Sequence, residues 1–272
     1  MSQTISYASP RSVDRIEDCY FYHKMDIPGA GVVDAHWDLR SSIDDYLGRF
    51  DFRGKRALDV GTAGGYLTFA MEQKGGDVVS FDMIDGTQWD VVPSVKMQDE
   101  LEEYRKKTYL VDQRLKNAYW FAHSRMKSKA RAYYGDIYDL PGGLGAFDVA
   151  VFGMILSHLR DPFQALYSVS RLVSDTIIIT NQMTESDDAM GFFIPAIDAR
   201  EQKAWWSLSS GCISRMLGIL GFEVKSRGVS MPMCTANSRV GPEKCVTLVA
   251  KRVAGSTCLT GSAKPPRVTA AA

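Results

Sequence analysis

The chain has 272 residues, a length that suits one large α/β domain or one domain with insertions. Its 45% hydrophobic and 24% charged residues are typical of a globular protein and exclude a low-complexity or fibrous chain. The 32 basic and 32 acidic residues cancel, so no overall charge attracts nucleic acid or a membrane surface.

The first predicted elements form a strand–turn–helix–strand unit. Residues 1–45 precede it and are assigned to an N-terminal cap segment. Strands are expected at 56–60 and 77–82, joined by an amphipathic helix over 67–74. The glycine pair at 75–76 ends this helix, as glycine does after a last helical turn.

The remaining elements continue the alternation of strand and helix, which indicates a mostly parallel sheet. Residues 176–180 are β-branched and are expected to form a strand buried on both faces. The expected elements are strands at 130–134, 147–153, 176–180, 222–226 and 245–251, with helices from Pro162 and over 213–220.

Two segments exceed this minimal pattern. They lie at about 90–128 and 183–207, within a domain assigned to 46–255, and residues 256–272 are expected to be a disordered tail. Insertions on such a scaffold usually lie over the carboxyl ends of the strands, where ligands bind. We expect them to form a lid; extra core or an oligomer surface is the alternative.

The turn after the first strand is rich in glycine, reading Asp59-Val-Gly-Thr-Ala-Gly-Gly65. A dinucleotide fingerprint would need glycine where Ala63 and Tyr66 stand, so a dinucleotide cofactor is disfavoured. Asp82 ends the second strand and can accept hydrogen bonds from both hydroxyls of a ribose. Its spacing from the turn is shared with dinucleotide enzymes and does not discriminate between cofactors.

The sequence Asp-x-Gly-x-x-Gly-Gly resembles motif I of the class I S-adenosylmethionine (SAM)-dependent methyltransferases, usually Asp-x-Gly-x-Gly-x-Gly. Residues 135–141 (Gly-Asp-Ile-Tyr-Asp-Leu-Pro) and 152–162, which end in His-Leu-Arg-Asp-Pro, are similar to two further motifs of that superfamily. Over residues 22–222 the chain most resembles the small-molecule and tRNA wobble-uridine methyltransferase-like group.

This resemblance implies a Rossmann-like α/β fold and SAM as cofactor, with S-adenosylhomocysteine (SAH) as product. The expected sheet has seven mostly parallel strands flanked by helices, with the last strand antiparallel and helical insertions forming the lid. The residues that the resemblance assigns to the cofactor are Asp59, Gly61, Thr62, Ala63, Gly65, Asp82, Met83, Asp136, Ile137, Gly153 and Trp37.

The candidate catalytic and substrate residues come from the same resemblance. His158 is the candidate general base, since histidine titrates near neutral pH; bracing of its loop is the alternative. For Asp136, the alternative to contact with the cofactor is to cap a turn. The substrate candidates are Tyr22, His23, Arg40, Trp89 and Trp205. Aromatic residues are more often plain core, which is the alternative for the aromatic members of this set. Arg40 stands in for the lysines that hold a carboxylated cofactor in the wobble-uridine enzymes.

The function that these residues predict is transfer of a methyl group from SAM to an oxygen or nitrogen of a small molecule, such as a natural product, by in-line displacement. A tRNA-modifying enzyme and a SAM-binding protein without transfer activity are the alternatives. We expect a small-molecule partner, no nucleic acid, and a monomer or homodimer.

Cysteine and histidine spacing predicts no metal site. The five cysteines form no Cys-x-x-Cys pair, and no two of the four histidines have the spacing of metal ligands. The chain shows no secretory signal pattern and no apolar run long enough for a bilayer. A cytoplasmic protein without membrane contact is expected.

Overall fold

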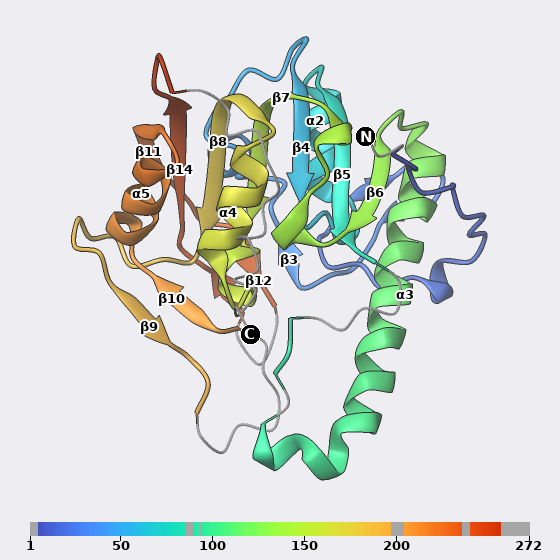
Figure 1. Cartoon of the computed structure of the whole chain (residues 1–272). Helices are drawn as coiled ribbons and strands as arrows, with labels where there is room; N and C mark the ends of the chain where they lie inside the picture. The colour runs from blue at the N-terminus through green and yellow to red at the C-terminus, as the bar shows by residue number, and fades with distance from the viewer. Residues whose placement is uncertain (1–4, 85–89, 93, 197–203, 236–239, 257–272) are drawn as a thin grey trace, which may run out of the picture.

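A computed structural model describes residues 5–84, 90–92, 94–196, 204–235 and 240–256. Its centre is a seven-stranded sheet (Figure 1). The strands of this sheet are β4 (Arg56–Val60), β5 (Asp77–Met83), β6 (Arg131–Gly135), β7 (Phe147–Gly153), β8 (Val173–Asn181), β11 (Phe222–Ser230) and β14 (Cys245–Arg252).

The strands lie in the order β11-β14-β8-β7-β4-β5-β6. Neighbours from β8 to β6 are parallel, whereas β14 pairs antiparallel with both β8 and β11. The last strand of the chain, β14, is therefore the antiparallel one, and it lies between β8 and β11. This arrangement confirms the predicted Rossmann-like fold.

Five α-helices and several short elements complete the described residues. The helices are α1 (Ile43–Tyr46), α2 (Tyr66–Gln73), α3 (Leu101–Met126), α4 (Pro162–Ser170) and α5 (Ser210–Ile219). The 3-10 turns are η1 (Ile16–Asp18), η2 (Val95–Glu100), η3 (Ile137–Asp139), η4 (Gly142–Leu144) and η5 (Leu156–His158). The short strands are β1 (Asp26–Ile27), β2 (Gly31–Val32), β3 (Trp37–Asp38), β9 (Gly191–Phe193), β10 (Trp206–Leu208), β12 (Met233–Cys234) and β13 (Gly241–Pro242).

The helix boundaries follow local signals in the sequence. The side chain of Asp161 accepts a hydrogen bond from the backbone N–H of Gln164, and Pro162 occupies the first turn of α4. Ser209 caps α5 in the same way through the N–H of Cys212. After the C-terminal end of α2, Gly75 takes a positive φ of 89°, which glycine adopts readily. These boundaries agree with the predicted ones to within a few residues.

The core has two layers because successive side chains of a strand point to opposite faces of the sheet. On one face, Leu58 and Phe152 pack with α4 and α5. On the other, Ala57 and Val151 pack with α1 and α2. A third cluster joins α2 and α3 to the N-terminal segment through Phe21, among others.

The two predicted insertions differ in structure. The first contains α3, which is largely buried from Leu115 to Ala122, while its N-terminal half extends beyond the carboxyl ends of the strands (Figure 1). The second carries the antiparallel pair β9–β10 in place of a helix. Aromatic residues such as Phe192, Phe193 and Trp206 favour a strand at these positions. Whether either insertion acts as a lid stays a prediction.

The N-terminal segment packs on the rest of the domain. The N–H of Ala8 donates to the carbonyl of Ala132 at 2.8 Å, on β6 at the edge of the sheet, and the N–H of Tyr20 donates to the carbonyl of Arg114 at 2.9 Å. The expected tail lies outside the described residues, except for Ser256. No helix in the described part of the chain has both the length and the apolar character that crossing a bilayer would require.

Candidate functional site

The four predicted motifs lie along the edge of the sheet that is formed by the carboxyl ends of its parallel strands. Gly61 follows β4, Asp82 lies near the end of β5, Asp136 follows β6, and Gly153 ends β7. These four strands are parallel neighbours. Since the carboxyl ends of parallel strands meet at the same edge, the chain brings its glycine turn and its candidate carboxylates together there.

The glycine turn is hydrogen-bonded to the end of β5. The N–H groups of Gly61 and Thr62 both donate to the carbonyl of Phe81, at 2.9 and 3.0 Å. Asp82 accepts from the N–H of Ala63 through Oδ2 and from the N–H of Met83 through Oδ1, each at 2.8 Å. Burial raises the pKa of Asp82, and these two backbone donors oppose that effect.

Three residues of the turn have left-handed backbone conformations. Gly61 and Gly65 have φ angles of 79° and 87°, and Ala63 has 48°. A Cβ on Gly65 would lie 2.7 Å from the rings of both Phe69 and Tyr119. Glycine is thus required at 65 by conformation and by space, whereas Ala63 adopts a conformation that disfavours a side chain.

Asp59 lies beneath the turn, with no solvent exposure. Its Oδ2 accepts from the hydroxyl of Thr68 at 2.6 Å, and Thr68 also contacts Thr62 at 2.9 Å and Ser80 at 2.7 Å. Oδ1 has no hydrogen-bond partner among the described residues. Burial is the main cause that raises the pKa of Asp59 to about 6, and the hydroxyl of Thr68 opposes it. Such a group can accept a cationic or hydrogen-bond-donating ligand.

Asp136 is exposed after β6, and its Oδ1 accepts from the N–H of Tyr138 at 2.9 Å. This is the capping arrangement that the sequence left open as the alternative. One carboxylate accepts several hydrogen bonds, so the cap does not compete with a role in cofactor binding. Ile137 is half-buried beside it and packs on the main core. Contact of either residue with the cofactor stays a prediction.

Gly153 and His158 belong to the loop that follows β7. A Cβ on Gly153 would lie 2.4 Å from Cδ1 of Leu67, so packing against α2 already requires glycine here. The next residue, Met154, has a positive φ of 58°, and its N–H donates to the carbonyl of Thr180 at 2.7 Å. His158 is half-buried at the end of η5. Its role as general base stays a prediction.

The N-terminal segment brings three aromatic candidates to the glycine turn. The backbone nitrogen of Tyr22 would lie 4.0 Å from a Cβ on Gly64. His23 forms a parallel bridge with the buried Trp37, and its ring centroid lies 5.8 Å from that of Tyr66 at the start of α2. Nδ1 of His23 has no partner in the described part of the chain, and burial lowers the pKa of His23 to about 4.

Three further candidates have different placements. Arg40 is exposed and forms a two-bond ion pair with Asp38 at 2.8 and 2.7 Å, which lowers the pKa of Asp38. Trp205 is buried; its indole N–H donates to the carbonyl of Asp90 and its backbone N–H to that of Ser157, both at 2.7 Å. Trp89 lies outside the described residues.

Asp90 organises a cluster that the sequence did not reveal, which we call the Asp90 clasp. Its carboxylate accepts from the hydroxyl of Tyr138, from the N–H of Arg160 at 2.7 Å, and from the guanidinium of Arg160. The indole N–H of Trp206 donates to the carbonyl of Arg160 at 2.9 Å. Together with Trp205, the clasp joins both insertions to the loops after β6 and β7. No sequence pattern links residues so far apart along the chain.

Other polar residues near this edge were also missed. Tyr119 and the ion pair of Asp112 with Lys116 lie on α3, and Asn181 ends β8 with its side-chain nitrogen unpartnered among the described residues. The four-residue spacing of Asp112 and Lys116 would have predicted their pairing on a helix. Nothing in the sequence indicated that this pair is buried.

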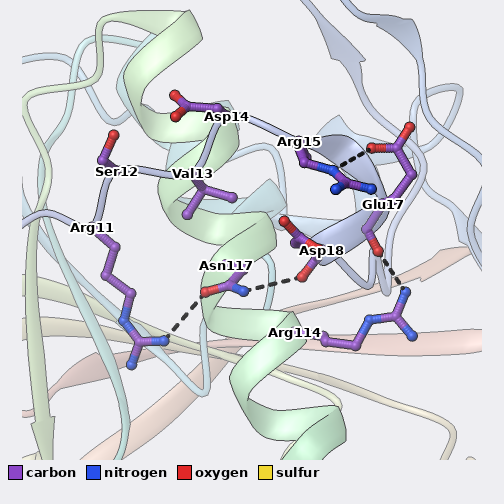
Figure 2. Close-up of a pocket in the computed structure, with 9 residues that line it drawn as sticks. All are labelled: Arg11, Ser12, Val13, Asp14, Arg15, Glu17, Asp18, Arg114 and Asn117. Atoms are coloured by element: carbon purple, nitrogen blue, oxygen red, sulfur yellow. Dashed lines mark hydrogen bonds and ion pairs between the residues drawn. The ribbon is translucent and has the colours of Figure 1, made fainter.

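A separate open hollow of about 510 Å³ lies between the N-terminal segment and α3 (Figure 2). Its polar groups bond to one another: Arg114 donates to the carbonyl of Glu17, and Asn117 donates to that of Asp18. Arg11 donates to the side chain of Asn117 at 3.4 Å. No predicted cofactor or substrate residue lines this hollow, so these bonds serve to attach the N-terminal segment to α3.

Comparison with known proteins identifies the family. A search of curated proteins gives no match. Similar crystal structures include a proposed RNA methyltransferase of Pyrococcus horikoshii, with 12% identity over 78% of this chain and 85% of that one and a TM-score of 0.49. Magnesium protoporphyrin IX methyltransferase of Synechocystis PCC 6803 has 15% identity over 79% and 78%, with a TM-score of 0.44. The 1,6-didemethyltoxoflavin-N1-methyltransferase of Burkholderia thailandensis has 16% identity over 78% and 75%, with a TM-score of 0.46.

These structural similarities concern the fold alone. The sequence model of a family described as "Methyltransferase domain" matches residues 35–217, more than half of the chain and all four motifs at the edge of the sheet. The chain therefore belongs to the methyltransferase-domain family.

Proposed function

We propose that this protein uses SAM to methylate an oxygen or nitrogen of a small molecule, and releases SAH. The observation that carries the proposal is the pair of acidic side chains, Asp59 and Asp82, beside the glycine turn. Both lie on the same face of adjacent strands, and one oxygen of Asp59 is buried without a partner among the described residues. A cofactor with a sulfonium and an ammonium group suits such a site.

The residues present fit SAM part by part. Asp82 would accept the ribose hydroxyls, since its backbone donors fix both oxygens and leave lone pairs available. Asp59 and the turn at 61–65 would hold the methionine part. Asp136 and Ile137 would contact the adenine. These are roles that the family resemblance assigns and that the placement of the residues supports.

The protein's part in the reaction is alignment, exclusion of water and proton transfer. SAM supplies a methyl group already activated by the positive sulfur. The chain has to place the acceptor atom in line with that methyl and sulfur. His158 would take the proton from a hydroxyl or amine acceptor. Tyr22, His23 and Trp205 would surround the acceptor molecule, and Trp37 would lie beside the cofactor.

The balanced charge of the chain supports a small-molecule acceptor over tRNA. Arg40, the candidate for an anionic group, already pairs with Asp38. A neutral acceptor is thus the class that we favour.

Two measurements test this proposal. Calorimetric titration with SAM and SAH should give binding of at least micromolar affinity; absence of binding would overturn it. Isotope-labelled SAM should then transfer its methyl group to a component of a metabolite extract. Label appearing only in tRNA would favour the tRNA alternative, and binding without any transfer would favour a non-catalytic SAM-binding protein.

The role of His158 needs its own control. His158→Ala should retain SAM binding and lose turnover, whereas His36→Ala, at a half-buried histidine that packs on Tyr20, should retain both. Turnover that survives in His158→Ala would show that the base lies elsewhere.

A further inference from the structure

Helix α3 lies over the face of the sheet that carries both candidate carboxylates. The register pairs Asp59 with Ser80 between β4 and β5, and Asp82 with Tyr134 between β5 and β6. Paired residues of parallel strands point to the same face, so these four side chains share one face. It is the face that α2 and α3 cover.

Lys116 of α3 lies over the ring of Tyr134, next to the strand position of Asp82. Its ammonium group is 4.7 Å from the ring centroid of Tyr134, the register partner of Asp82. Lys116 and its partner Asp112 are 2.9 Å apart, with side chains only 3% and 5% exposed. The charge of Lys116 lowers the pKa of Asp82, in opposition to the larger effect of burial. A buried cation thus acts on the carboxylate that would hold the ribose.

Tyr119, almost one turn further along α3, is connected to the other carboxylate. Its hydroxyl lies 2.9 Å from Ser80, Ser80 lies 2.7 Å from Thr68, and Thr68 donates to Asp59 at 2.6 Å. An ionised carboxylate only accepts hydrogen bonds. Each hydroxyl in this hydrogen-bonded series can therefore donate to the next one in the direction of Asp59. Hydrogen bonds in such a chain strengthen one another.

We infer that α3 is a positioning element of the cofactor site, whose residues Lys116 and Tyr119 keep Asp82 and Asp59 ionised for a cationic cofactor. This inference rests on the proposed function. Neither residue needs to touch the cofactor. The insertion would thereby set the pH range over which the site binds SAM.

The surrounding groups support this assignment. Burial raises the pKa of both Asp59 and Asp82, and the charge of Asp82 raises that of Asp59 further. Other titratable neighbours of Asp59 are Tyr46 on α1 and Tyr119 on α3, and burial raises the pKa of each. Among the described residues, Lys116 is the cation whose charge lowers the pKa of Asp82.

Two variants test the inference. Lys116→Met alone would take from the buried Asp112 the cation that it pairs with, which costs stability, so the double variant Asp112→Asn/Lys116→Met removes the pair together. Tyr119→Phe removes a single oxygen and keeps the ring. The matched controls are Lys106→Met and Tyr109→Phe, which remove the same groups from exposed positions of α3.

The measurement is the dissociation constant of SAM from about pH 5 to about pH 8, with folding checked by circular dichroism. Affinity should fall on the acid side as the carboxylates take up protons. The midpoint of this fall should move upward in the double variant, by less than loss of Lys116 alone would give, because the variant also removes the negative charge of Asp112. A smaller upward shift is expected for Tyr119→Phe, and none for the controls.

The outcomes separate the two proposals. Wild-type protein that fails to bind SAM at any pH would overturn the proposed function and this inference with it. Wild-type protein that binds, with midpoints unchanged in the double variant and in Tyr119→Phe, would overturn the inference alone. Should the double variant not fold, Tyr119→Phe decides.

Discussion

The backbone N–H of Ala63 donates a hydrogen bond of 2.8 Å to Oδ2 of Asp82. This bond ties the middle of the glycine turn to the end of the neighbouring strand. It also orients the carboxylate that would bind the ribose of SAM. The turn and the carboxylate are therefore one structural unit, and a change in either is expected to affect the other.

Asp82→Asn should weaken SAM binding strongly. The amide has one acceptor oxygen where the carboxylate has two, so it cannot serve both Ala63 and Met83 and still accept from the ribose. Loss of charged hydrogen bonds worth about 1.5–3 kcal/mol corresponds to a roughly 10- to 100-fold higher dissociation constant. Calorimetry would measure it. Asp77→Asn, on the same strand but exposed, should bind SAM as the wild type does.

Substitutions at Ala63 and Gly65 should have opposite effects on stability. Ala63→Gly relieves a left-handed alanine, and the gain after the added flexibility of the unfolded chain is about 0.5–1 kcal/mol. Gly65→Ala combines a φ of 87° with contacts of 2.7 Å to two aromatic rings, so it should lose more than about 2 kcal/mol.

Urea denaturation of both variants measures these free energies. Ala63→Gly should also retain SAM binding, because its N–H still donates to Asp82. A destabilised Ala63→Gly protein would mean that the alanine methyl makes a contact that outweighs its strain.

The sheet could be predicted because its signals are local. Apolar runs such as 147–153 and the glycine turn at 61–65 depend on neighbouring residues only, and parallel strands then place their carboxyl ends together. Strand β11 runs to Ser230 and is longer than expected. It is an edge strand with several exposed polar residues, and so it lacks the apolar pattern by which a buried strand is found.

The rest of the site depends on contacts between distant residues. Asp90 meets Arg160 across 70 positions, and Ser80 meets Tyr119 across 39. Gly153 shows the same limit: its position suggested close approach to the cofactor, whereas the contact that excludes a Cβ is with Leu67. Such pairs are set by how helices pack on the sheet, which hydrophobic periodicity does not specify.

Replacement of His23 should change how stability depends on pH. The pKa of His23 is about 4 in the folded protein, below its ordinary value of about 6.5. The unfolded chain binds more protons between these values, so wild-type stability rises with pH across that window. His23→Phe removes this term. The free energy of unfolding of His23→Phe minus that of the wild type is the quantity to compare at the two pH values. This difference should be about 2 kcal/mol larger near pH 5 than near pH 7.

Asp59→Asn should reveal a term of opposite sign. The pKa of Asp59 is raised to about 6, so the folded state binds more protons than the unfolded state between about pH 4 and pH 6. Wild-type stability therefore falls as pH rises through this window, partly cancelling the effect of His23. Denaturation of Asp59→Asn at several pH values should show a steeper rise with pH than the wild type. An unchanged slope would place the ionisation of Asp59 outside this range.

Removal of the charge at Asp90 tests the clasp that joins the two insertions. Asp90 is 12% exposed and accepts from Tyr138 and Arg160, so Asp90→Asn weakens charge-assisted bonds in a largely buried place. We expect the free energy of unfolding to fall by about 1–3 kcal/mol. Asp187→Asn is the matched control, since Asp187 pairs with Arg227 at 2.7 Å but is 89% exposed. It should change the free energy by less than about 1 kcal/mol. Equal losses in the two variants would mean that the clasp contributes no more than a surface ion pair, and that the insertions are held by Trp205 and its apolar contacts instead.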